Sequence, residues 1–396
     1  MLSDARRSVM SLVGLALFAA VAHAEPPAAT GLRPLPPQAA DVPWPTTAWP
    51  VGPLPAGVSA EQLETALAVV ATPQPHMGET RAVVIIHRGK LVSERYMPGY
   101  SADTPLLSWS MAKSVTQAMV GVAVRRGLVE IDKPMGNPRW PAGDPRAQIP
   151  WRNWINMIDG QDYHELGVGD QTRNDAARML YGPGRLDVAS YAASLPLSHP
   201  PATHWNYNSA GTNLVADALG RVFAPGATGA DRRTRMSAVM KAELFTPLGM
   251  TSAQPEFDAA GNFVGSAFVY ATARDWAKFG LLYLRDGMWQ DQRILPEHWV
   301  DFARTKTPVE DCDVYGAGFW ITPPSGRGKP DPALTPDGPR DLFIAQGHEG
   351  QLVVIVPSKD LIVVRLGHLA DLSGWAPLGA WVQRVVALFP DVSTPP

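Results

Sequence analysis

The chain has 396 residues, of which 45% are hydrophobic and 18% charged, and its 34 basic and 37 acidic side chains leave a net charge of −3. This ordinary globular composition argues against a collagen, a coiled coil or a mostly disordered chain. The near-neutral balance, with no basic face or tail, argues against a nucleic-acid-binding protein. The single cysteine, Cys312, cannot form an internal disulfide, and we interpret it as a small buried apolar residue rather than a nucleophile.

The N-terminus has the three parts of a secretory signal peptide. Arg6 and Arg7 precede an apolar run over residues 9–21, which ends in small residues at Ala24 before a polar, proline-rich stretch. This pattern predicts a signal peptide over residues 1–24, cleavage after Ala24 and a periplasmic or secreted protein, and it leaves a twin-arginine route open. The run is short for a membrane span, so an uncleaved anchor is the alternative and no stable membrane insertion is expected.

The mature chain opens with a proline-rich arm over residues 25–60, because proline disfavours helices and central strands. Two hairpins are then predicted from apolar runs joined by short polar turns: residues 81–86 with 91–96, and residues 352–356 with 361–366. Apolar residues at helical spacing predict helices over residues 111–126, 213–223, 236–245, 272–285 and 377–388.

Strands near both ends of the chain with helices between them predict an α+β fold, in which an antiparallel sheet carries a helical insertion. We expect one folded domain over residues 61–390. Its sheet lobe would be formed by about 75–108 and 312–390, and its mainly helical inserted lobe by about 110–305. A cleft between two such lobes is a common place for chemistry.

Ser110 and Lys113 are the only serine and lysine in the chain that are three residues apart in this order. Positions i and i+3 share one face of a helix, so the hydroxyl and the amine are within hydrogen-bonding reach. In the first turn of a helix, unpaired backbone N–H groups favour a developing negative charge. A lysine with a lowered pKa can accept the proton of such a serine. The alternative is an N-cap serine followed by a solvated lysine.

Two further elements could complete a catalytic site. Tyr207 lies in a polar, turn-prone stretch directly before the predicted helix at 213–223, where its hydroxyl could act as a second proton carrier. Gly347 to Gln351 directly precede the strand at 352–356, and a backbone N–H on that edge could point at an oxyanion. A structural tyrosine and an ordinary glycine-rich turn are the alternatives.

Together, Ser110-Met111-Ala112-Lys113, the Tyr207 element and Gly347-His348-Glu349-Gly350-Gln351 resemble the penicillin-binding and serine β-lactamase superfamily. The resemblance is to its class C-like, β-lactamase-related branch, which includes D-alanyl-D-alanine carboxypeptidases, esterases and 6-aminohexanoate-dimer hydrolases. It covers about residues 75–385, and the Met157 to Gly160 segment looks like the one that precedes a substrate-facing loop in that branch. The resemblance implies a β-lactamase/transpeptidase-like fold, with an antiparallel sheet flanked by helices.

The resemblance also implies roles for these residues. Ser110 would be the acylating nucleophile, Lys113 its proton acceptor, and Tyr207 the general acid and base, with the division of labour between Lys113 and Tyr207 left open. The oxyanion hole would be formed by the backbone N–H groups of Ser110 and Gln351. Residues that contact the substrate would be His348, Gly350 and Ser209.

Two positions depart from the usual pattern of β-lactamases. The tyrosine element usually has Asn at its third position, but this chain has Ser209 there, and dimer hydrolases and esterases also have serine. In the third element, His348-Glu349-Gly350 replaces the Lys-Thr-Gly of β-lactamases. A shorter hydroxyl reaches a substrate amide less well, and a histidine is only partly charged near neutral pH. Both changes predict a weaker grip on a β-lactam, and neither affects acyl transfer itself.

Other patterns are less informative. Asp162, His164, Glu165 and Asp170 lack the spacing of a known metal-ligand set, so we interpret them as a polar surface loop and expect neither a metal nor an organic cofactor. The motifs of α/β-hydrolases, zinc proteases, Walker loops and dinucleotide-binding folds are absent. Trp109 and Trp205 could line an apolar acyl pocket, and core packing is the equally good alternative.

The resulting hypothesis is an exported serine hydrolase that cleaves small amides or esters through an acyl-enzyme on Ser110. It would resemble an aminohexanoate-oligomer hydrolase or a carboxylesterase, and its partner would be a small-molecule amide or ester. The alternatives are a β-lactamase, a D-alanyl-D-alanine carboxypeptidase, and a non-catalytic member that binds a peptide or a cell-wall fragment. Substrate and oligomeric state are outside what the sequence predicts.

Overall fold

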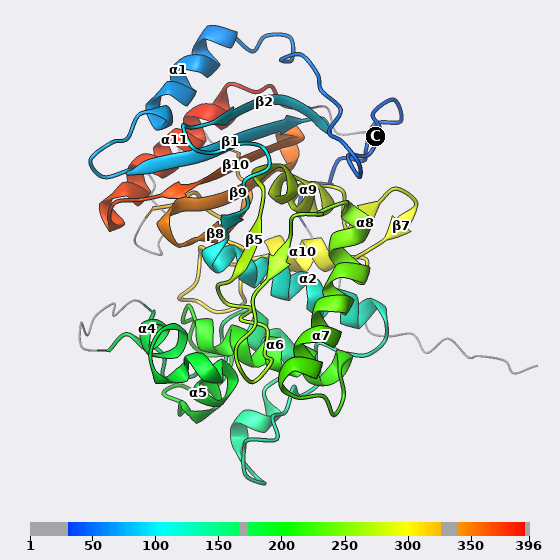
Figure 1. Cartoon of the computed structure of the whole chain (residues 1–396), viewed down its shortest axis with the longest axis vertical. Helices are drawn as coiled ribbons and strands as arrows, with labels where there is room; N and C mark the ends of the chain where they lie inside the picture. The colour runs from blue at the N-terminus through cyan, green and yellow to red at the C-terminus, as the bar shows by residue number, and fades with distance from the viewer. Residues whose placement is uncertain (1–30, 166–172, 326–338, 393–396) are drawn as a thin grey trace, which may run out of the picture.

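The computed structural model describes residues 31–165, 173–325 and 339–392, which form a sheet lobe and a helical lobe (Figure 1). The sheet has five strands in the order β2-β1-β10-β9-β8, and every neighbouring pair is antiparallel. The strands are β1 (Glu79–His87), β2 (Lys90–Tyr96), β8 (Phe343–Gly347), β9 (Gln351–Val356) and β10 (Leu361–His368). The predicted α+β fold with an antiparallel sheet is therefore confirmed.

Both predicted hairpins are present in this sheet. β1 pairs with β2, β9 pairs with β10, and the pairing of β1 with β10 joins the two ends of the chain. The sequence analysis did not predict β8, a short strand that contains the polar Gln346 and ends in Gly347. It lies beside β9 at the edge of the sheet, so the strand next to the other lobe is β8 and not β9.

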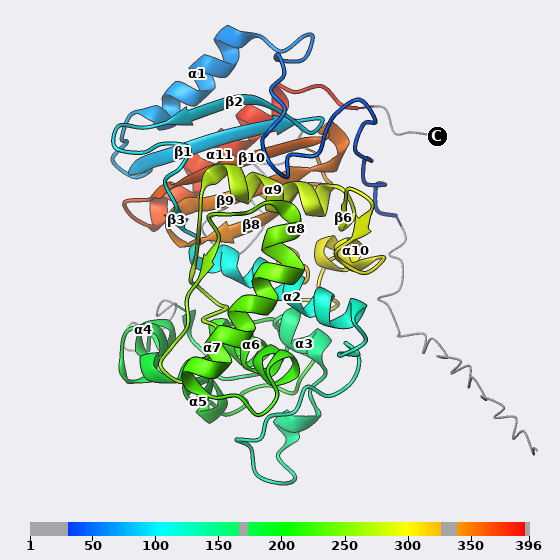
Figure 2. The same ribbon diagram turned by 45° about the vertical axis from the view of Figure 1, so that its right-hand side comes forward.

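Helices cover both faces of the sheet, which is the reason its strands are apolar on both sides. Val83 and Ile85 of β1 pack in one cluster with α1 (Ala60–Ala71) and α11 (Trp375–Ala387). Val84 and Ile86 pack in the other cluster with α9 (Ala273–Leu284), as expected when successive side chains point to opposite faces. Figure 2 shows α1 and α11 on one side of the sheet and α9 on the other. The sequence analysis assigned the α9 segment to the helical lobe, but it packs on the sheet.

The other helices are α2 (Ala112–Arg125), α3 (Trp151–Ile155), α4 (Asp175–Leu180), α5 (Val188–Ser194), α6 (Ser209–Phe223), α7 (Gly229–Met240), α8 (Thr246–Leu248) and α10 (Trp299–Arg304). Two small sheets add β3 (Leu106–Leu107), β5 (Val269–Ala271) and β4 (Gln254–Pro255), and β6 (Met288–Trp289) with β7 (Gln292–Arg293). α2 is buried along almost its whole length and packs against α6. It ends before Gly127, whose φ of +69° suits a glycine that terminates a helix.

α6 begins four residues earlier than predicted, and this places the site residues near it. The side chain of Asn208 accepts a hydrogen bond from the backbone N–H of Gly211 at 2.8 Å and so caps the helix. The residues of this first turn, Ser209, Ala210 and Gly211, are buried but small, so they give no apolar periodicity in the sequence. Consequently Tyr207 lies just before the helix and Ser209 is its first residue.

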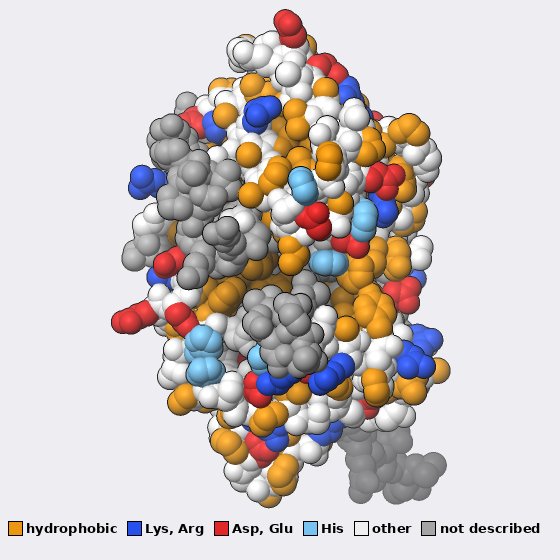
Figure 3. Space-filling view, turned by 90° about the vertical axis from the view of Figure 1, so that its left-hand side faces the viewer, with side chains coloured by type: hydrophobic (Ala, Val, Ile, Leu, Met, Phe, Trp, Pro, Cys, Tyr) orange, Lys and Arg blue, Asp and Glu red, His pale blue; other side chains and the backbone are white. Residues whose placement is uncertain are grey.

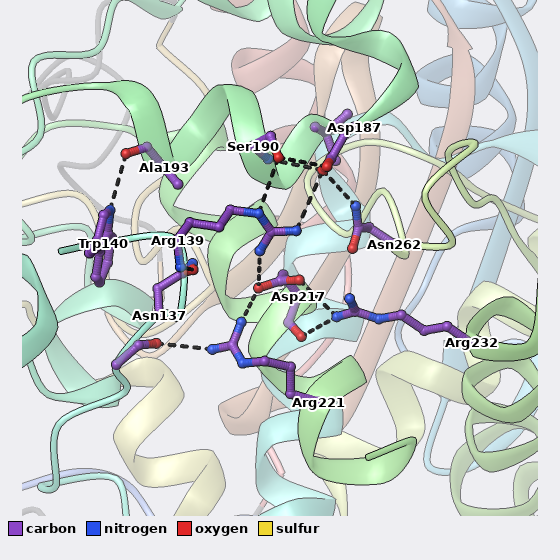
Figure 4. Close-up of polar contacts among 12 residues, drawn as sticks. Asn137, Arg139, Trp140, Asp187, Ser190, Ala193, Asp217, Arg221, Arg232 and Asn262 are labelled. Carbon is purple, nitrogen blue, oxygen red and sulfur yellow. Dashed lines mark hydrogen bonds and ion pairs between the residues drawn. The ribbon is translucent and has the colours of Figure 1, made fainter. Parts of the chain in front are cut away.

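A buried cluster of charges holds the helical lobe together (Figure 4). Asp217 on α6 is fully buried, and its carboxylate pairs with Arg139 at 3.0 Å, with Arg232 of α7 at 2.8 Å and with Arg221 one helical turn away. Arg139 also lies 3.7 Å from Asp187 at the start of α5. The carboxylate of Asp217 therefore connects a loop with α6 and α7, and Arg139 extends the cluster to α5 through Asp187.

The described part of the proline-rich arm packs on the body of the protein. Val51 forms a parallel β-bridge with Leu91 of β2. The indole N–H of Trp49 donates a hydrogen bond to the backbone carbonyl of Arg274 at 3.1 Å. The predicted signal peptide lies outside the described residues. Within the described ranges, no helix has both the length and the apolar character needed to cross a membrane.

Candidate active site

Ser110 lies at the junction of the two lobes. It is the middle residue of a tight helical turn, Trp109–Met111, that leads into α2, and this turn contacts β8 of the sheet lobe. Trp109 has a φ of +46°, a conformation that tryptophan rarely adopts. The hydroxyl side of this turn borders a cavity of about 800 Å³ that residues of both lobes line. In Figure 3 a hollow containing hydrophobic side chains lies between the lobes on this face.

Lys113 is one turn further along and is buried against Ser110. Its Nζ lies 2.9 Å from Ser110 Oγ, 2.8 Å from Ser209 Oγ and 2.8 Å from the carbonyl oxygen of Ser266. All three partners are uncharged oxygens. Burial lowers the pKa of Lys113 to about 8, and the negative charge of Glu165 opposes part of that shift. A lysine of this kind is partly neutral near physiological pH and can accept a proton from the adjacent serine.

Tyr207 completes the group of predicted catalytic side chains. The centre of its ring lies 4.8 Å from Lys113 Nζ. Burial, and secondarily the charge of Glu165, raises the pKa of Tyr207 well above its usual value, although hydrogen bonding with Ser110 acts in the opposite direction. The phenol therefore stays protonated, which suits a proton donor and not a resting base. The structure thus brings Ser110, Lys113 and Tyr207 together: Ser110 and Tyr207 line the cavity, and Lys113 is buried behind Ser110.

The third predicted element lies differently from expectation. His348 to Gly350 form the turn between β8 and β9, with left-handed φ values of +61° at Glu349 and +80° at Gly350. Because the chain reverses here, Gly347 and His348 line the cavity, whereas Gln351 is buried in β9. The side chain of Gln351 accepts a hydrogen bond from the N–H of Gly367 at 2.9 Å on the neighbouring strand. The structure therefore does not place Gln351 at the cavity, whose edge is formed by β8.

The end of β8 lies directly against the nucleophile. A Cβ atom added to Gly347 would lie 2.1 Å from the carbonyl oxygen of Ser108 and 3.1 Å from the backbone N of Ser110, so only glycine allows this approach. The residue that lines the cavity next is His348, and burial lowers its pKa. Gly350 does not line the cavity: a Cβ there would lie 2.6 Å from the guanidinium of Arg365, which is buried behind the turn.

Glu165 is a site residue that the sequence analysis missed. It was interpreted as part of a polar surface loop, but it lines the cavity and accepts hydrogen bonds from the hydroxyl of Ser209 at 3.0 Å and from its backbone N–H at 3.3 Å. The available signal was its position five residues after Gly160, where the related branch has a substrate-facing loop. Among the residues that the structure describes, no three His, Cys, Asp or Glu side chains are grouped as metal ligands would be.

Aromatic side chains form the apolar part of the cavity wall. Trp109 and Trp205 line it, as predicted for an acyl pocket, and Trp320, which the sequence analysis did not single out, lines it as well. Ring centres of Tyr207 and Trp320 are 5.2 Å apart. The described residues that line the cavity include two carboxylates, those of Asp162 and Glu165, and neither a lysine nor an arginine.

The comparisons with known proteins identify the family and the fold. A family model described as Beta-lactamase matches residues 74–374. None of the curated proteins matches the chain. The structure is similar to that of a protein from Bacillus anthracis assigned as a 6-aminohexanoate-dimer hydrolase, at 19% identity and a TM-score of 0.65, with 87% of this chain and 89% of that one covered.

Two other solved structures share the fold at similar distance. A penicillin binding protein from Bacillus halodurans has 18% identity and a TM-score of 0.59, and the match covers 83% of this chain and 100% of that one. A family VIII carboxylesterase has 14% identity and a TM-score of 0.59, with coverage of 85% and 98%. At these identities the similarity establishes the fold, and function has to be argued from the site.

Proposed function

Because the chain belongs to the Beta-lactamase family, whose members are generally serine hydrolases, we propose that it is a serine hydrolase that forms an acyl-enzyme on Ser110. The observation that carries the proposal is the 2.9 Å contact between Ser110 Oγ and the buried Nζ of Lys113, whose pKa is lowered to about 8. A serine hydroxyl next to a partly neutral amine has a base for its proton when it attacks a carbonyl carbon.

In the proposed reaction, Lys113 accepts the proton of Ser110 as Oγ attacks the substrate carbonyl. The oxyanion that forms lies between the start of α2 and the end of β8, where backbone N–H groups near Ser110 and His348 are available to stabilise it. Tyr207, protonated because its pKa is raised, donates a proton to the leaving group. Water then attacks the acyl-enzyme and gives one proton to the tyrosinate, which becomes a phenol again. Lys113 returns its proton to Ser110 Oγ as the bond between Oγ and the acyl carbon breaks.

The chemistry of the cavity supports a substrate whose acyl group is apolar and carries no negative charge. The wall contains Trp109, Trp205 and Trp320, whereas its described lining has carboxylates and no lysine or arginine. The lowered pKa of His348 leaves that side chain mostly neutral near pH 7, so it is a poor partner for a substrate carboxylate. We therefore favour an amidase or esterase over a β-lactamase or a D-alanyl-D-alanine carboxypeptidase, whose substrates carry a carboxylate.

The cellular location is a separate proposal that rests on the N-terminal sequence alone. The arrangement of Arg6, Arg7 and the apolar run before Ala24 supports export and cleavage of a signal peptide. N-terminal sequencing of the protein recovered from its host's culture medium or periplasm tests it. A mature N-terminus at Glu25 is the expected result, and recovery of intact protein from the membrane fraction would contradict it.

The acyl-enzyme is tested by intact mass and peptide mapping after brief exposure to p-nitrophenyl butyrate. We expect an adduct on the peptide that contains Ser110 in the wild type and none in Ser110→Ala, with release of p-nitrophenol lowered by at least about 10⁴-fold in the variant. A folded wild type with neither adduct nor product would favour the non-catalytic alternative, a member of the fold that only binds its ligand.

A further inference from the structure

Ser209 connects the buried lysine to a carboxylate. Its Oγ lies 2.8 Å from Lys113 Nζ on one side and 3.0 Å from Glu165 Oε1 on the other, and its backbone N–H donates to Glu165 Oε2 at 3.3 Å. The carboxylate thus lies at the N-terminus of α6, at the positive end of the helix dipole. An ionised carboxylate only accepts hydrogen bonds, so the hydrogen of the Ser209 hydroxyl points to Glu165.

This direction limits what Lys113 can do in its neutral form. A neutral amine has two N–H groups and one lone pair. The carbonyl oxygen of Ser266 can only accept, so it takes one N–H. The hydroxyl of Ser209 has given its own hydrogen to Glu165, so it takes the second N–H. The lone pair is left for the third partner, the hydroxyl of Ser110 at 2.9 Å.

We propose that Glu165 is a positioning residue for acylation: by holding the hydrogen of Ser209, it directs the lone pair of neutral Lys113 toward Ser110. The inference rests on the proposed acyl transfer at Ser110. Without the carboxylate, the Ser209 hydroxyl is free to donate to the amine, and this hydrogen bond occupies the lone pair that has to receive the proton of the nucleophile.

The same arrangement gives Glu165 an electrostatic effect that a merely structural residue lacks. Around Lys113, the side chains of Tyr207, Ser110 and Ser209 are uncharged, and Glu165 is the charged group that raises the pKa of the amine against its burial. Glu165 likewise raises the pKa of Tyr207, which stays protonated with or without this charge because burial is the larger cause. Its removal therefore lowers the pKa of Lys113 and leaves Tyr207 a phenol.

The test compares Glu165→Gln, Glu165→Asp and Ser209→Ala with the wild type. The readout is the second-order rate of Ser110 labelling by a fluorophosphonate probe, measured from pH 5 to pH 10, which reports the reactivity of the serine independently of any natural substrate. Glu243→Gln is the matched control, because Glu243 pairs with Arg125 and Arg126 away from the cavity. Thermal melting establishes that each variant is folded.

For Glu165→Gln we expect the high-pH plateau of the labelling rate to fall by about 10-fold, which is less than the 10²–10⁴-fold effect of a general base because Lys113 itself remains. The pH at which the rate falls on the acid side should move to a lower value. Glu165→Asp, which keeps the charge, should recover part of the plateau. The double variant Glu165→Gln, Ser209→Ala should be no slower than Ser209→Ala alone, because the two residues act through one hydrogen bond. Glu243→Gln should stay within twofold of the wild type.

The outcomes separate this inference from the proposed function. If the wild type is labelled, and Glu165→Gln has the same labelling rate at high pH and the same fall of that rate at low pH, the positioning role of Glu165 is wrong. The assignment of Ser110 as the nucleophile is then unaffected. Additive losses in the double variant would also overturn it. If a folded wild type is not labelled at any pH, Ser110 has no working base and both proposals fail. If labelling follows the expected pattern but p-nitrophenyl butyrate is not cleaved, the positioning role stands and the proposed substrate class fails.

Discussion

Two of the buried charged sites in the described part of the chain solve the problem of burial in opposite ways. In the helical lobe, Asp217 is fully buried and pairs with the guanidinium groups of Arg139, Arg221 and Arg232. In the cleft, Lys113 is buried with only uncharged oxygens in contact, and the nearest carboxylate that influences it is separated from it by the hydroxyl of Ser209.

The difference shows why the charge of Asp217 has a structural role and that of Lys113 a chemical one. A buried ion in contact with its counterions keeps its charge, and removing one partner leaves the others uncompensated. A buried ion without such contact is destabilised in its charged form, so its pKa moves toward neutrality and it becomes available for proton transfer. The comparison predicts that changes to the two clusters affect different properties of the protein.

The largest effect is expected on activity, from Lys113→Met. The variant removes the proposed base and replaces a buried cation with an apolar side chain of similar length. We expect kcat/KM for p-nitrophenyl butyrate to fall by about 10³-fold or more, while the free energy of unfolding stays the same or rises. Enzyme kinetics and urea unfolding measured on the same preparation check this. A strongly destabilised Lys113→Met would mean that this lysine is a structural ion like those at Asp217.

The second largest effect is expected on stability, from Asp217→Asn. The change leaves three arginines, Arg139, Arg221 and Arg232, without their shared carboxylate. We expect the free energy of unfolding to fall by about 3–5 kcal/mol, with kcat/KM per folded molecule unchanged. Urea unfolding combined with titration of active sites by the fluorophosphonate probe checks both statements.

Asp231 provides the control for this variant. It lies on α7 next to Arg232 in sequence and pairs with Arg235 one helical turn away, but its side chain is 56% exposed. Because exposed ion pairs contribute little, Asp231→Asn should change the free energy of unfolding by less than about 1 kcal/mol. Equal losses for Asp217→Asn and Asp231→Asn would contradict the structural role of the buried cluster.

The two clusters also differ in how far they can be predicted from sequence. Ser110 and Lys113 are three residues apart on one helix, so their contact is local and visible as a motif. The residues of the Asp217 cluster come from a loop and three helices between residues 139 and 232, and only the packing of those helices brings them together. Glu165 was missed for the same reason: its position after Gly160 gives no sign that its carboxylate reaches Ser209, the first residue of α6.

The position of Gln351 away from the cavity has a more specific cause. The sequence analysis assumed that the edge of the site was formed by the strand following the glycine-containing element, and the strong apolar signal of residues 352–356 supported that choice. Left-handed conformations at Glu349 and Gly350 instead turn the chain, so the short strand before the element lies at the cavity. Hydrophobic periodicity predicts that a strand exists, but its place in the sheet depends on pairing with distant strands.

A pH dependence of activity tests the difference between the clusters without any mutation. A base acts in its neutral form, so protonation of Lys113 below its pKa of about 8 should lower kcat/KM by about tenfold per pH unit, and above that pKa the rate should level off. The raised pKa of Tyr207 keeps its phenol protonated, so no descending limb is expected below pH 10. The pH profile of Asp217→Asn should coincide with that of the wild type, because the charges of the Asp217 cluster are not coupled to Lys113 in the cleft.

If kcat/KM instead rises with pH only below pH 6.5, the base is His348, whose pKa is lowered from 6.5 by burial. The cleft would then hold a charged lysine, and the contrast with the arginine cluster would be lost.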